Sequence, residues 1–338
     1  MMGLALLELR LGGNMRRREF IAGLGGAAAM PFVARAQSVP VIGFLNGQSV
    51  DTYAHLVAAF RRGLREMGFV NGQNAVVEYR WAEGHDDRLS TLATELVGRG
   101  ASVLVASGGI AAGMAAHKVT KDVPIVFITG SDPIRYGLVA SHNRPGGNAT
   151  GVSFLVNQLN AKRLEIATQL VPNARVVGFM LRPSNPTSAS DTREVEAAAA
   201  TLGIRLLTFK VESSREFSSA FEAAARERVG ILLVHTDPVF LSNRNALVAA
   251  AQQHAVPAMY EVREFVMTGG LASYGTDLVE AYRQLGIYAG RIVKGEKPGD
   301  LPVLQSTRFE LAINLNTAKA LGLTVPTNLL VAADEVIE

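Results

Sequence analysis

Cysteine is absent from this chain of 338 residues. Its absence excludes disulfide bonds, thiolate catalysis, cysteine-based metal sites and an N-terminal cysteine that carries lipid. The six histidines include no HxH or HExxH pair, the spacings that bring two imidazoles to one metal ion. We therefore expect neither a metal site nor a cofactor.

Motifs of catalysis are also missing. The sequence has no GxSxG nucleophile elbow and no Walker loop. Gly23, Gly25 and Ala28 mimic part of a dinucleotide fingerprint, but no strand precedes them. Asp86 and Asp87 have the position of a solvated helix start. The sequence thus gives no support for an enzyme, and a hydrolase stays an alternative because active sites converge on unrelated spacings.

No apolar run reaches the roughly 20 residues that a membrane-spanning helix needs. The run Ala22–Val33 is short, follows the basic Arg16–Arg18 and precedes the small residues of Ala34–Ala36. A basic segment, a short apolar run and a small-x-small site together form a secretory signal. We expect cleavage after Ala36, which leaves Gln37 as the first residue of a mature chain that is not embedded in the membrane.

The basic segment has a further feature. Its order Arg17-Arg18-x-Phe20-Ile21 fits a twin-arginine signal, which exports proteins that are already folded. Met15 stands directly before this segment and is a better start than the first residue. The sequence therefore predicts a signal peptide within residues 1–36, a misplaced start codon, and a protein of the periplasm.

The basic character of the chain comes from this leader. Lysine and arginine number 33 against 30 acidic residues, and residues 1–36 hold five of the former and two of the latter. Residues 37–338 thus keep 28 of each and are formally neutral. A neutral chain gives no support for binding to nucleic acid or to an anionic membrane surface.

The remaining sequence alternates strand-like and helix-like segments. Nine short runs have the composition of buried strands: Val39–Leu45, Ala75–Tyr79, Val103–Ala106, Ile125–Thr129, Arg175–Met180, Arg205–Phe209, Ile231–His235, Ala258–Tyr260 and Gly270–Tyr274. Eight stretches have helical spacing: Asp51–Met67, Asp86–Val97, Ala111–Val119, Leu159–Leu170, Thr187–Leu202, Arg215–Arg226, Asn243–His254 and Asp277–Lys294. This alternation predicts parallel sheets covered by helices on both faces.

The length and the repeat of this pattern predict two lobes. About 300 residues exceed the size at which one core stops growing. We expect an α/β fold with two doubly wound parallel-sheet lobes joined by a multi-strand hinge. The predicted N-terminal lobe covers residues 38–150 and the C-terminal lobe residues 151–275. Residues 276–338 are predicted to form a helix, a third crossing and a return to the N-terminal lobe.

Three segments interrupt the pattern and are candidates for the crossings between lobes. The turn-rich Asn143–Gly151 leads to the first, Tyr274–Thr276 is the second, and Pro298–Phe309 is the third. The last helix, Thr317–Leu321, is then expected to return towards the first lobe.

Several short segments carry a resemblance to a known family. In chain order they are Val41–Leu45, Gly72–Asn74, Tyr79–Gly84, Asp132-Pro133, Gly137–Val139, Arg144–Asn148, Thr150-Gly151, Gly269–Gly275 and Asn314–Gly322. With these segments, residues 38–338 resemble the substrate-binding proteins of ABC transporters, of the tryptophan/tyrosine transport-system type. That family is related to the type I periplasmic binding proteins.

The resemblance implies a Venus flytrap that closes on a small-molecule solute. It further implies a monomer that delivers the solute to an ABC permease in the inner membrane, driven by a partner ATPase. A sensor that presents its solute to a membrane receptor would share these features, so sensing stays open beside transport. One departure concerns Leu181–Pro186, where members that bind aromatic amino acids have an acidic residue and this chain has none. That departure favours an anionic or neutral solute.

Ligands of open α/β sheets bind beyond the carboxyl ends of the strands, so the loops there hold the candidate residues. Those of the first lobe are Asn46 and Gly47 (followed by Gln48 and Ser49), Ser107, Gly108, Gly109, Ser131 and Asp132. Backbone N–H groups, amides and hydroxyls of this kind suit a carboxylate or a carbonyl. The alternative for each is a helix cap or a tight turn.

The matching loops of the second lobe supply the other candidates. They are Arg182, Ser184, Asn185, His235, Asp237, Tyr260 (followed by Glu261) and Tyr274. Arginine can hold a carboxylate with two hydrogen bonds, and tyrosine can stack on a ring. Surface charge for the arginine and packing inside the lobe for the tyrosines are the alternatives.

Overall fold

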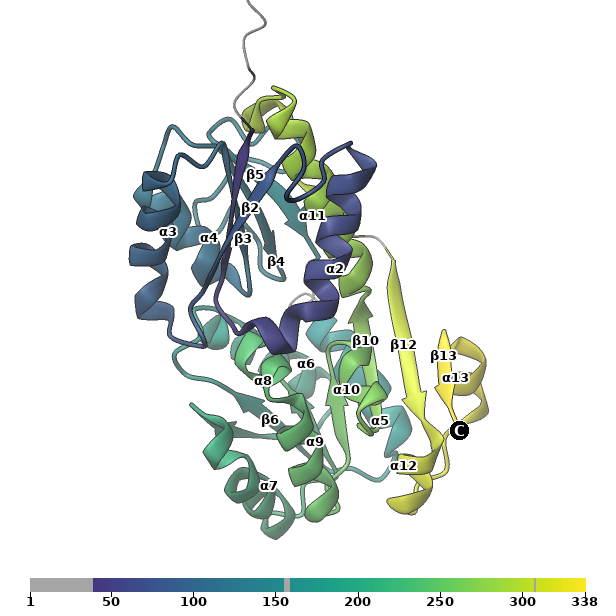
Figure 1. Cartoon of the computed structure of the whole chain (residues 1–338). Helices are drawn as coiled ribbons and strands as arrows, with labels where there is room; N and C mark the ends of the chain where they lie inside the picture. The colour runs from purple at the N-terminus through teal and green to yellow at the C-terminus, as the bar shows by residue number, and fades with distance from the viewer. Residues whose placement is uncertain (1–38, 155–158, 307) are drawn as a thin grey trace, which may run out of the picture. The chain divides into compact units, whose positions relative to one another are not determined.

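A computed structural model describes residues 39–154, 159–306 and 308–338 (Figure 1). The predicted twin-arginine segment and the cleavage site between Ala36 and Gln37 lie outside the described residues. Within the described part, no helix combines the length and the apolar character that a membrane span requires.

Six parallel strands form the sheet of the first lobe. In spatial order they are β11 (Leu304–Gln305), β5 (Ala149–Ser153), β4 (Ile125–Thr129), β3 (Val103–Ser107), β1 (Val41–Asn46) and β2 (Val76–Trp81). Strand β3 shows why both faces are covered. Val103 and Val105 belong to one buried cluster, whereas Leu104 and Ala106 belong to another. Side chains of a strand alternate between its faces, so an unbroken apolar strand has to be buried on both.

The helices of the first lobe divide between these faces. They are α2 (Val50–Glu66), α3 (Leu89–Gly98, preceded by the 3₁₀ turn η1, Asp86–Arg88), α4 (Ile110–Val119) and α11 (Leu278–Val293). Helices α3 and α4 pack on one face, and α2 and α11 pack together on the other (Figure 1). A second 3₁₀ turn, η4 (Pro298–Asp300), lies between α11 and β11.

Seven strands form the sheet of the second lobe, and only the pair β10–β12 is antiparallel. In spatial order they are β13 (Glu335–Ile337), β12 (Phe309–Asn314), β10 (Ala272–Thr276), β9 (Ala258–Tyr260), β8 (Ile231–Val234), β6 (Val176–Leu181) and β7 (Arg205–Lys210). The two-sheet α/β fold predicted from the sequence is therefore confirmed.

Helices again cover the two faces of this sheet. They are α5 (Asn160–Leu170), α6 (Ser188–Thr201), η3 (Ser214–Glu216), α7 (Phe217–Arg226), α8 (Pro238–Ser242), α9 (Arg244–Gln253), α10 (Arg263–Met267), α12 (Leu315–Ala320) and α13 (Thr327–Ala332). Buried residues of α5, α6, α12 and α13 share one cluster, and those of α7, α9 and α10 share the other.

Helix α11 follows β10 of the second lobe but packs on α2 of the first. Glycines make this packing close. A Cβ atom at Gly63 would overlap the carbonyl oxygen of Arg283, and one at Gly286 would overlap that of Phe60. The two backbones are therefore in direct contact, and any larger residue at Gly63 or Gly286 would push the helices apart.

The chain crosses between the lobes at three places: after β5, after β10, and between β11 and β12. The second and third crossings are paired, because Thr276 at the end of β10 lies opposite Phe309 at the start of β12. The first crossing lies beside the second, where the Thr276 hydroxyl donates to the carbonyl of Phe154 at 3.4 Å. The crossing segments are thus neighbours.

Two parts of the predicted domain division are wrong. The boundary after residue 150 falls inside β5, which belongs to the first sheet, so the first lobe continues to Ser153. The helix predicted over Thr317–Leu321 exists as α12, but it packs in the second lobe, with Ala318 in that lobe's core. The reason is β12, which carries the chain back into the second sheet before α12 begins. Of the last segment, α11, η4 and β11 belong to the first lobe.

Candidate functional site

A cavity lies between the carboxyl ends of the two sheets. Its wall is formed by loops that follow β1, β3 and β4 of the first lobe and β6, β8 and β9 of the second, together with side chains from α2 and α11. The candidate residues that line it are Gly108, Gly109, Ser131, Arg182, Asn185 and Asp237. The structure brings these six together from both lobes.

The first lobe contributes a helix N-terminus to this wall. Gly109 precedes α4 and has φ +111°, and no side chain caps the helix. Gly108 has φ +74°, and a Cβ there would overlap Asn46 Oδ1. Both positions require glycine. Gly109, Ile110 and Ala111 all line the cavity, so the first N–H groups of a helix of ten residues lie at its wall. Such groups attract a carboxylate.

Three candidates of the first lobe lie beneath the wall rather than in it. Asn46 and Ser107 are fully buried, and Asn46 Nδ2 donates to Ser107 Oγ at 2.9 Å. The backbone N–H of Gly47 donates to the carbonyl of Ser107, which ties the two loops together. Gln48, the next residue along, does line the cavity. The role that the structure gives to Asn46, Gly47 and Ser107 is to hold the loops that form the wall.

Ser131 and Asp132 are adjacent in the chain, but of the two Ser131 alone lines the cavity. The backbone N–H of Ser131 donates to Thr129 Oγ1 at 3.0 Å, and both residues line the cavity. Asp132 Oδ1 instead accepts from the N–H of Ile134 at 3.0 Å and lies 3.7 Å from His142 Nε2. Asp132 therefore stabilises a turn beside the cavity, which is the alternative that the sequence left open for it.

A charged network forms the wall of the second lobe. Arg182 Nε donates to Asp237 Oδ2 at 2.9 Å, and Asn185 Nδ2 donates to the same oxygen at 2.7 Å. Asp237 is only 1% exposed, and its Oδ1 also caps α8 by accepting from the N–H of Val239. Burial lowers the pKa of Arg182, but the charges of Asp237 and Asp86 outweigh it and leave that pKa raised.

The same arginine reaches the other lobe. Arg182 Nη2 lies 3.5 Å from Asp86 Oδ2, and Asp86 belongs to η1 of the first lobe. Burial raises the pKa of Asp86, and Arg182 opposes this shift. Ser184 accepts a bond from Arg182 Nη1 at 2.6 Å but is exposed and bonds to Glu212, so it supports the arginine from outside the cavity.

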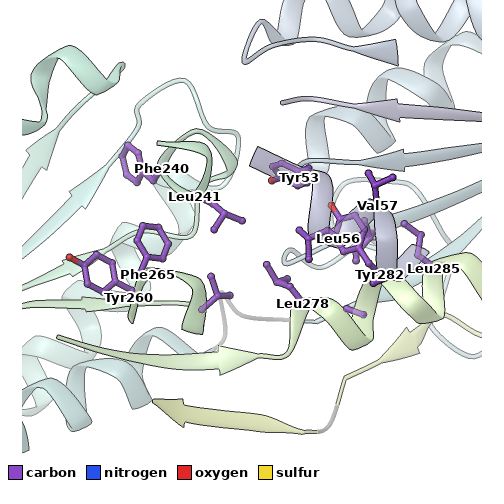
Figure 2. Close-up of a cluster of buried hydrophobic side chains, with 14 of the residues drawn as sticks. Tyr53, Leu56, Val57, Phe240, Leu241, Tyr260, Phe265, Leu278, Tyr282 and Leu285 are labelled. Carbon is purple, nitrogen blue, oxygen red and sulfur yellow. The ribbon is translucent and has the colours of Figure 1, made fainter. Parts of the chain in front are cut away.

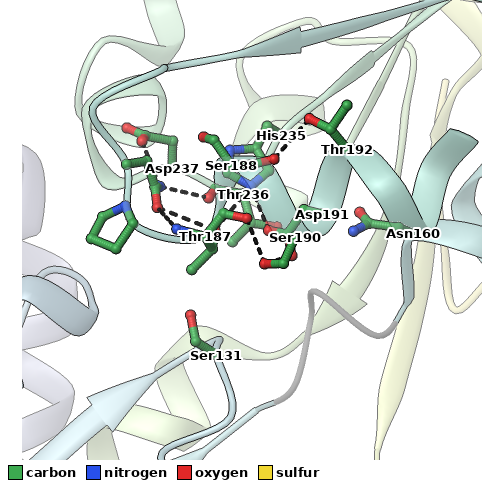
Figure 3. Close-up of polar contacts among 12 residues, drawn as sticks. Ser131, Asn160, Thr187, Ser188, Ser190, Asp191, Thr192, His235, Thr236 and Asp237 are labelled. Atoms are coloured by element: carbon green, nitrogen blue, oxygen red, sulfur yellow. Dashed lines mark hydrogen bonds and ion pairs between the residues drawn. The ribbon is translucent and has the colours of Figure 1, made fainter. Parts of the chain in front are cut away.

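His235 lies in the core of the second lobe and does not line the cavity. Its Nε2 is 2.6 Å from Asp191 Oδ2 and 3.2 Å from Thr187 Oγ1. Figure 3 shows His235 together with Thr187, Ser190 and Asp191 in the second lobe, apart from Ser131 of the first lobe. Thr187 both contacts the histidine and lines the cavity, so it connects the buried pair with the site.

The two candidate tyrosines also pack inside the protein. Tyr260 is fully buried and stacks on Phe265 at 4.6 Å between ring centroids. Tyr274 lies in β10 with its ring 6.3 Å from that of Phe309. Packing, the alternative given for both, is what the structure shows. Neither tyrosine lines the cavity, but Glu261, the residue after Tyr260, does.

Glu261 is the most deeply buried acid at this wall apart from Asp237. It is 3% exposed, and its Oε2 has no hydrogen-bond partner. Burial raises the pKa of Glu261 to about 8, while the charge of Arg163 opposes the shift. Its carboxyl is therefore mostly protonated at neutral pH.

Aromatic and aliphatic side chains complete the wall. Tyr53 of α2, Phe154 after β5 and Tyr282 of α11 line the cavity, together with Ile128, Leu241, Val262 and Leu278. Figure 2 shows Leu278, at the start of α11, between the buried groups of the two lobes. Burial raises the pKa of both tyrosine hydroxyls. This wall suits the apolar part of a solute.

The sequence missed this aromatic wall, because Tyr53 and Tyr282 have the spacing of ordinary core residues of a helix. Asp86 could have been found, since it follows the carboxyl end of β2. Its presence matters for the kind of solute. The loop Leu181–Pro186 lacks an acidic residue, yet Asp86, Asp237 and Glu261 bring three carboxyl groups to the cavity from other loops. The preference for an anionic or neutral solute therefore stays a prediction, and these three carboxyl groups count against it.

Comparison with known proteins agrees with this architecture. A family model described as ABC transporter substrate binding protein matches residues 38–337. A tyrosine-binding protein of Clostridioides difficile is 27% identical over 268 residues, which are 78% of this chain and 75% of the relative.

Solved structures show the same similarity. The ABC domain of Streptococcus pneumoniae in complex with L-Trp has a TM-score of 0.80 and 28% identity, over 89% of this chain and all of that one. The 5-methylthioribose-bound solute binding protein of Thermotoga lettingae matches 88% of this chain and 98% of that one. Its TM-score is 0.59 at 17% identity, which shows a shared fold alone.

Proposed function

We propose that this chain, which belongs to the ABC transporter substrate-binding protein family, captures an aromatic amino acid in the periplasm and delivers it to an ABC permease. The observation that carries the proposal is the composition of the cavity wall. One helix N-terminus, three carboxyl groups and a set of aromatic side chains face a single space. An aromatic amino acid has a carboxylate for the helix N-terminus, an ammonium group for the carboxyl groups and a ring for the aromatic side chains.

Each part of such a solute has a partner of suitable chemistry. The N–H groups at the start of α4 attract its carboxylate. Asp86, Asp237 and Glu261 favour its ammonium group, and Tyr53, Phe154 and Tyr282 form an apolar wall for its ring. The relatives that bind tyrosine and L-Trp support this choice of solute.

Capture requires the lobes to move. A solute enclosed by both lobes can enter only when they separate, and contacts to both stabilise the closed form over the open one. The three neighbouring crossings provide the hinge. The closed, loaded form is then the one that docks on the permease, whose ATPase supplies the energy for import. A sensor that passes its solute to a receptor would use the same closure.

The test is direct measurement of binding. We expect L-tyrosine or L-tryptophan to bind in isothermal titration calorimetry and to raise Tm through linkage. Solution scattering should show compaction on binding. Mass spectrometry of the recovered solute should show no chemical conversion, because the family and the relatives are binding proteins and not enzymes. Tight binding without compaction would contradict closure.

Export needs its own test. We propose a twin-arginine signal that is cleaved after Ala36. Sequencing of the exported protein should begin at Gln37, and replacing Arg17 and Arg18 by lysine should abolish export. Full export of the lysine variant would assign the leader to another route.

A further inference from the structure

Glu261 lines the cavity with a carboxyl oxygen that has no hydrogen-bond partner, whereas the carboxyl group of Asp237 is fully bonded. Asp237 accepts bonds from Arg182, Asn185 and the N–H of Val239, so both of its oxygens have partners. Glu261 lines the same cavity and is 97% buried, but its Oε2 has none. A buried polar atom without a partner costs free energy, and such atoms in folded proteins call for an explanation.

Titratable groups on several elements surround Glu261. Arg163 of α5 is the cation on that side, and Asp237 and Glu264 of α10 are the nearby acids. Tyr53 of α2 and Tyr260 lie within electrostatic range of Glu261. Glu264 in turn lies 3.6 Å from His55 Nε2. Burial is the main reason that this carboxyl group keeps its proton in the empty protein, and the two acids add to its effect against the charge of Arg163.

The guanidinium of Arg182 does not change this balance. It is shared between Asp237 and Asp86, at 2.9 and 3.5 Å, and its remaining nitrogen donates to Ser184. The cavity therefore has one arginine engaged by two carboxylates and, next to them, a third carboxyl group whose oxygen is unpaired. A positive charge is what this set of groups lacks.

We propose that Glu261 is a specificity-determining residue, which selects solutes that carry a cationic nitrogen by accepting a hydrogen bond from that nitrogen at Oε2. The inference rests on the proposed function, since it takes this cavity as the solute site. The nitrogen supplies the partner that Oε2 lacks, and its charge replaces the proton of the carboxyl group. The proton passes to solvent, and the ammonium group keeps its own protons.

The main experiment compares amino acids with their deaminated analogues. The probes are L-tyrosine and L-tryptophan against 3-(4-hydroxyphenyl)propanoate and 3-indolepropanoate, with wild type and Glu261→Gln. Glutamine keeps the size of glutamate but has no negative charge. We expect the substitution to weaken binding of the amino acids at least tenfold and to change binding of the analogues less than threefold. An equal loss for both kinds of probe, or no loss for either, would overturn the inference.

The experiment separates the two proposals. Wild type that binds none of the four probes refutes aromatic amino acid capture and removes the basis of the inference. Wild type that binds amino acids, with a Glu261→Gln variant of unchanged preference, refutes the inference and leaves the capture proposal standing. Thermal unfolding of each variant confirms that the fold is intact.

Proton release gives a second measurement. Calorimetry at pH 7 in buffers of different ionisation enthalpy should show close to one proton released per amino acid bound by wild type, and none by Glu261→Gln. Glu310→Gln is the matched control, because burial also raises the pKa of Glu310, to about 7, and Glu310 does not line the cavity. Proton release that disappears in Glu310→Gln and persists in Glu261→Gln would assign the proton to Glu310 of β12 and overturn the inference.

Discussion

Arg182 of the second lobe and Asp86 of the first approach each other to 3.5 Å across the cavity. The pair joins the lobes at the cavity itself, because both residues line it. Its contribution is modest because the Asp86 side chain is 33% exposed, and ion pairs of this kind contribute about 1 kcal/mol or less.

Asp86→Asn should therefore shift the empty protein towards a more open form without unfolding it. The open population should rise by up to about fivefold, which is the effect of about 1 kcal/mol. Solution scattering of the empty protein measures the change as a larger radius of gyration. Asp87→Asn is the control, since Asp87 is exposed in the same 3₁₀ turn. Identical scattering curves for the two variants would show that the bridge does not hold the lobes.

Gly109 makes a second contact between the lobes. A Cβ there would come within 3.0 Å of Pro238 Cγ on the second lobe, and the backbone has φ +111°. Gly109→Ala should lower stability by about 1 kcal/mol through backbone strain and should also impede closure. Gly137→Ala separates the two effects, because Gly137 has φ +68° with no atom near its Cβ position. Only Gly109→Ala should weaken solute binding in calorimetry. Equal affinities in the two variants would argue against closure at this contact.

The contact between α2 and α11 gives a prediction for stability. Gly63→Ala places a methyl group against the backbone of α11 and should lower the free energy of unfolding by about 2 kcal/mol or more. Gly98→Ala is the control, since Gly98 lies in α3 with open space at its Cβ position, and it should be neutral or stabilising. Urea unfolding measures both. A Gly63→Ala variant as stable as Gly98→Ala would contradict the close helix contact.

The buried carboxyl group of Glu261 makes the stability of the empty protein depend on pH. Its pKa rises from 4.5 to about 8 on folding, so the folded protein holds a proton that the unfolded chain releases between these values. This contribution to stability is complete below pH 4.5 and is lost as the pH rises towards 8. Glu261→Gln should therefore be more stable than wild type at pH 7.5, by about 4 kcal/mol. Tm measured from pH 5 to 8 should show the two proteins diverging. Parallel Tm curves would mean that Glu261 is ionised when the protein is empty.

The sequence predicted the fold better than the site, for physical reasons. Strands such as β3 and β8 are short apolar runs, a pattern that predicts a buried strand directly. Strand β5 could not be predicted in this way, because its sequence is small and polar. Its Gly151 packs so tightly that a Cβ would overlap the carbonyl oxygen of Phe127. With β5 unseen, the end of the first lobe and the position of Phe154 could not be predicted.

Some residues at the cavity could be predicted from the sequence and others could not. Gly108, Gly109, Arg182 and Asp237 follow predicted strands, and the rule that ligands lie beyond strand ends was enough to place them. Tyr282 comes from α11, which lies far along the chain, and its approach to the cavity depends on how that helix packs on α2. The pattern of apolar residues in a helix shows that a side chain is buried, but it does not show against what.

The glycine contact between α2 and α11 also decides which parts of the molecule can turn. Because α11 is fixed to α2, the segment from α11 to β11 has to travel with the first lobe, although the second lobe precedes and follows it in the chain. In the proposed opening, the lobes would therefore turn on the few bonds on either side of that segment, and not on flexibility spread along the chain.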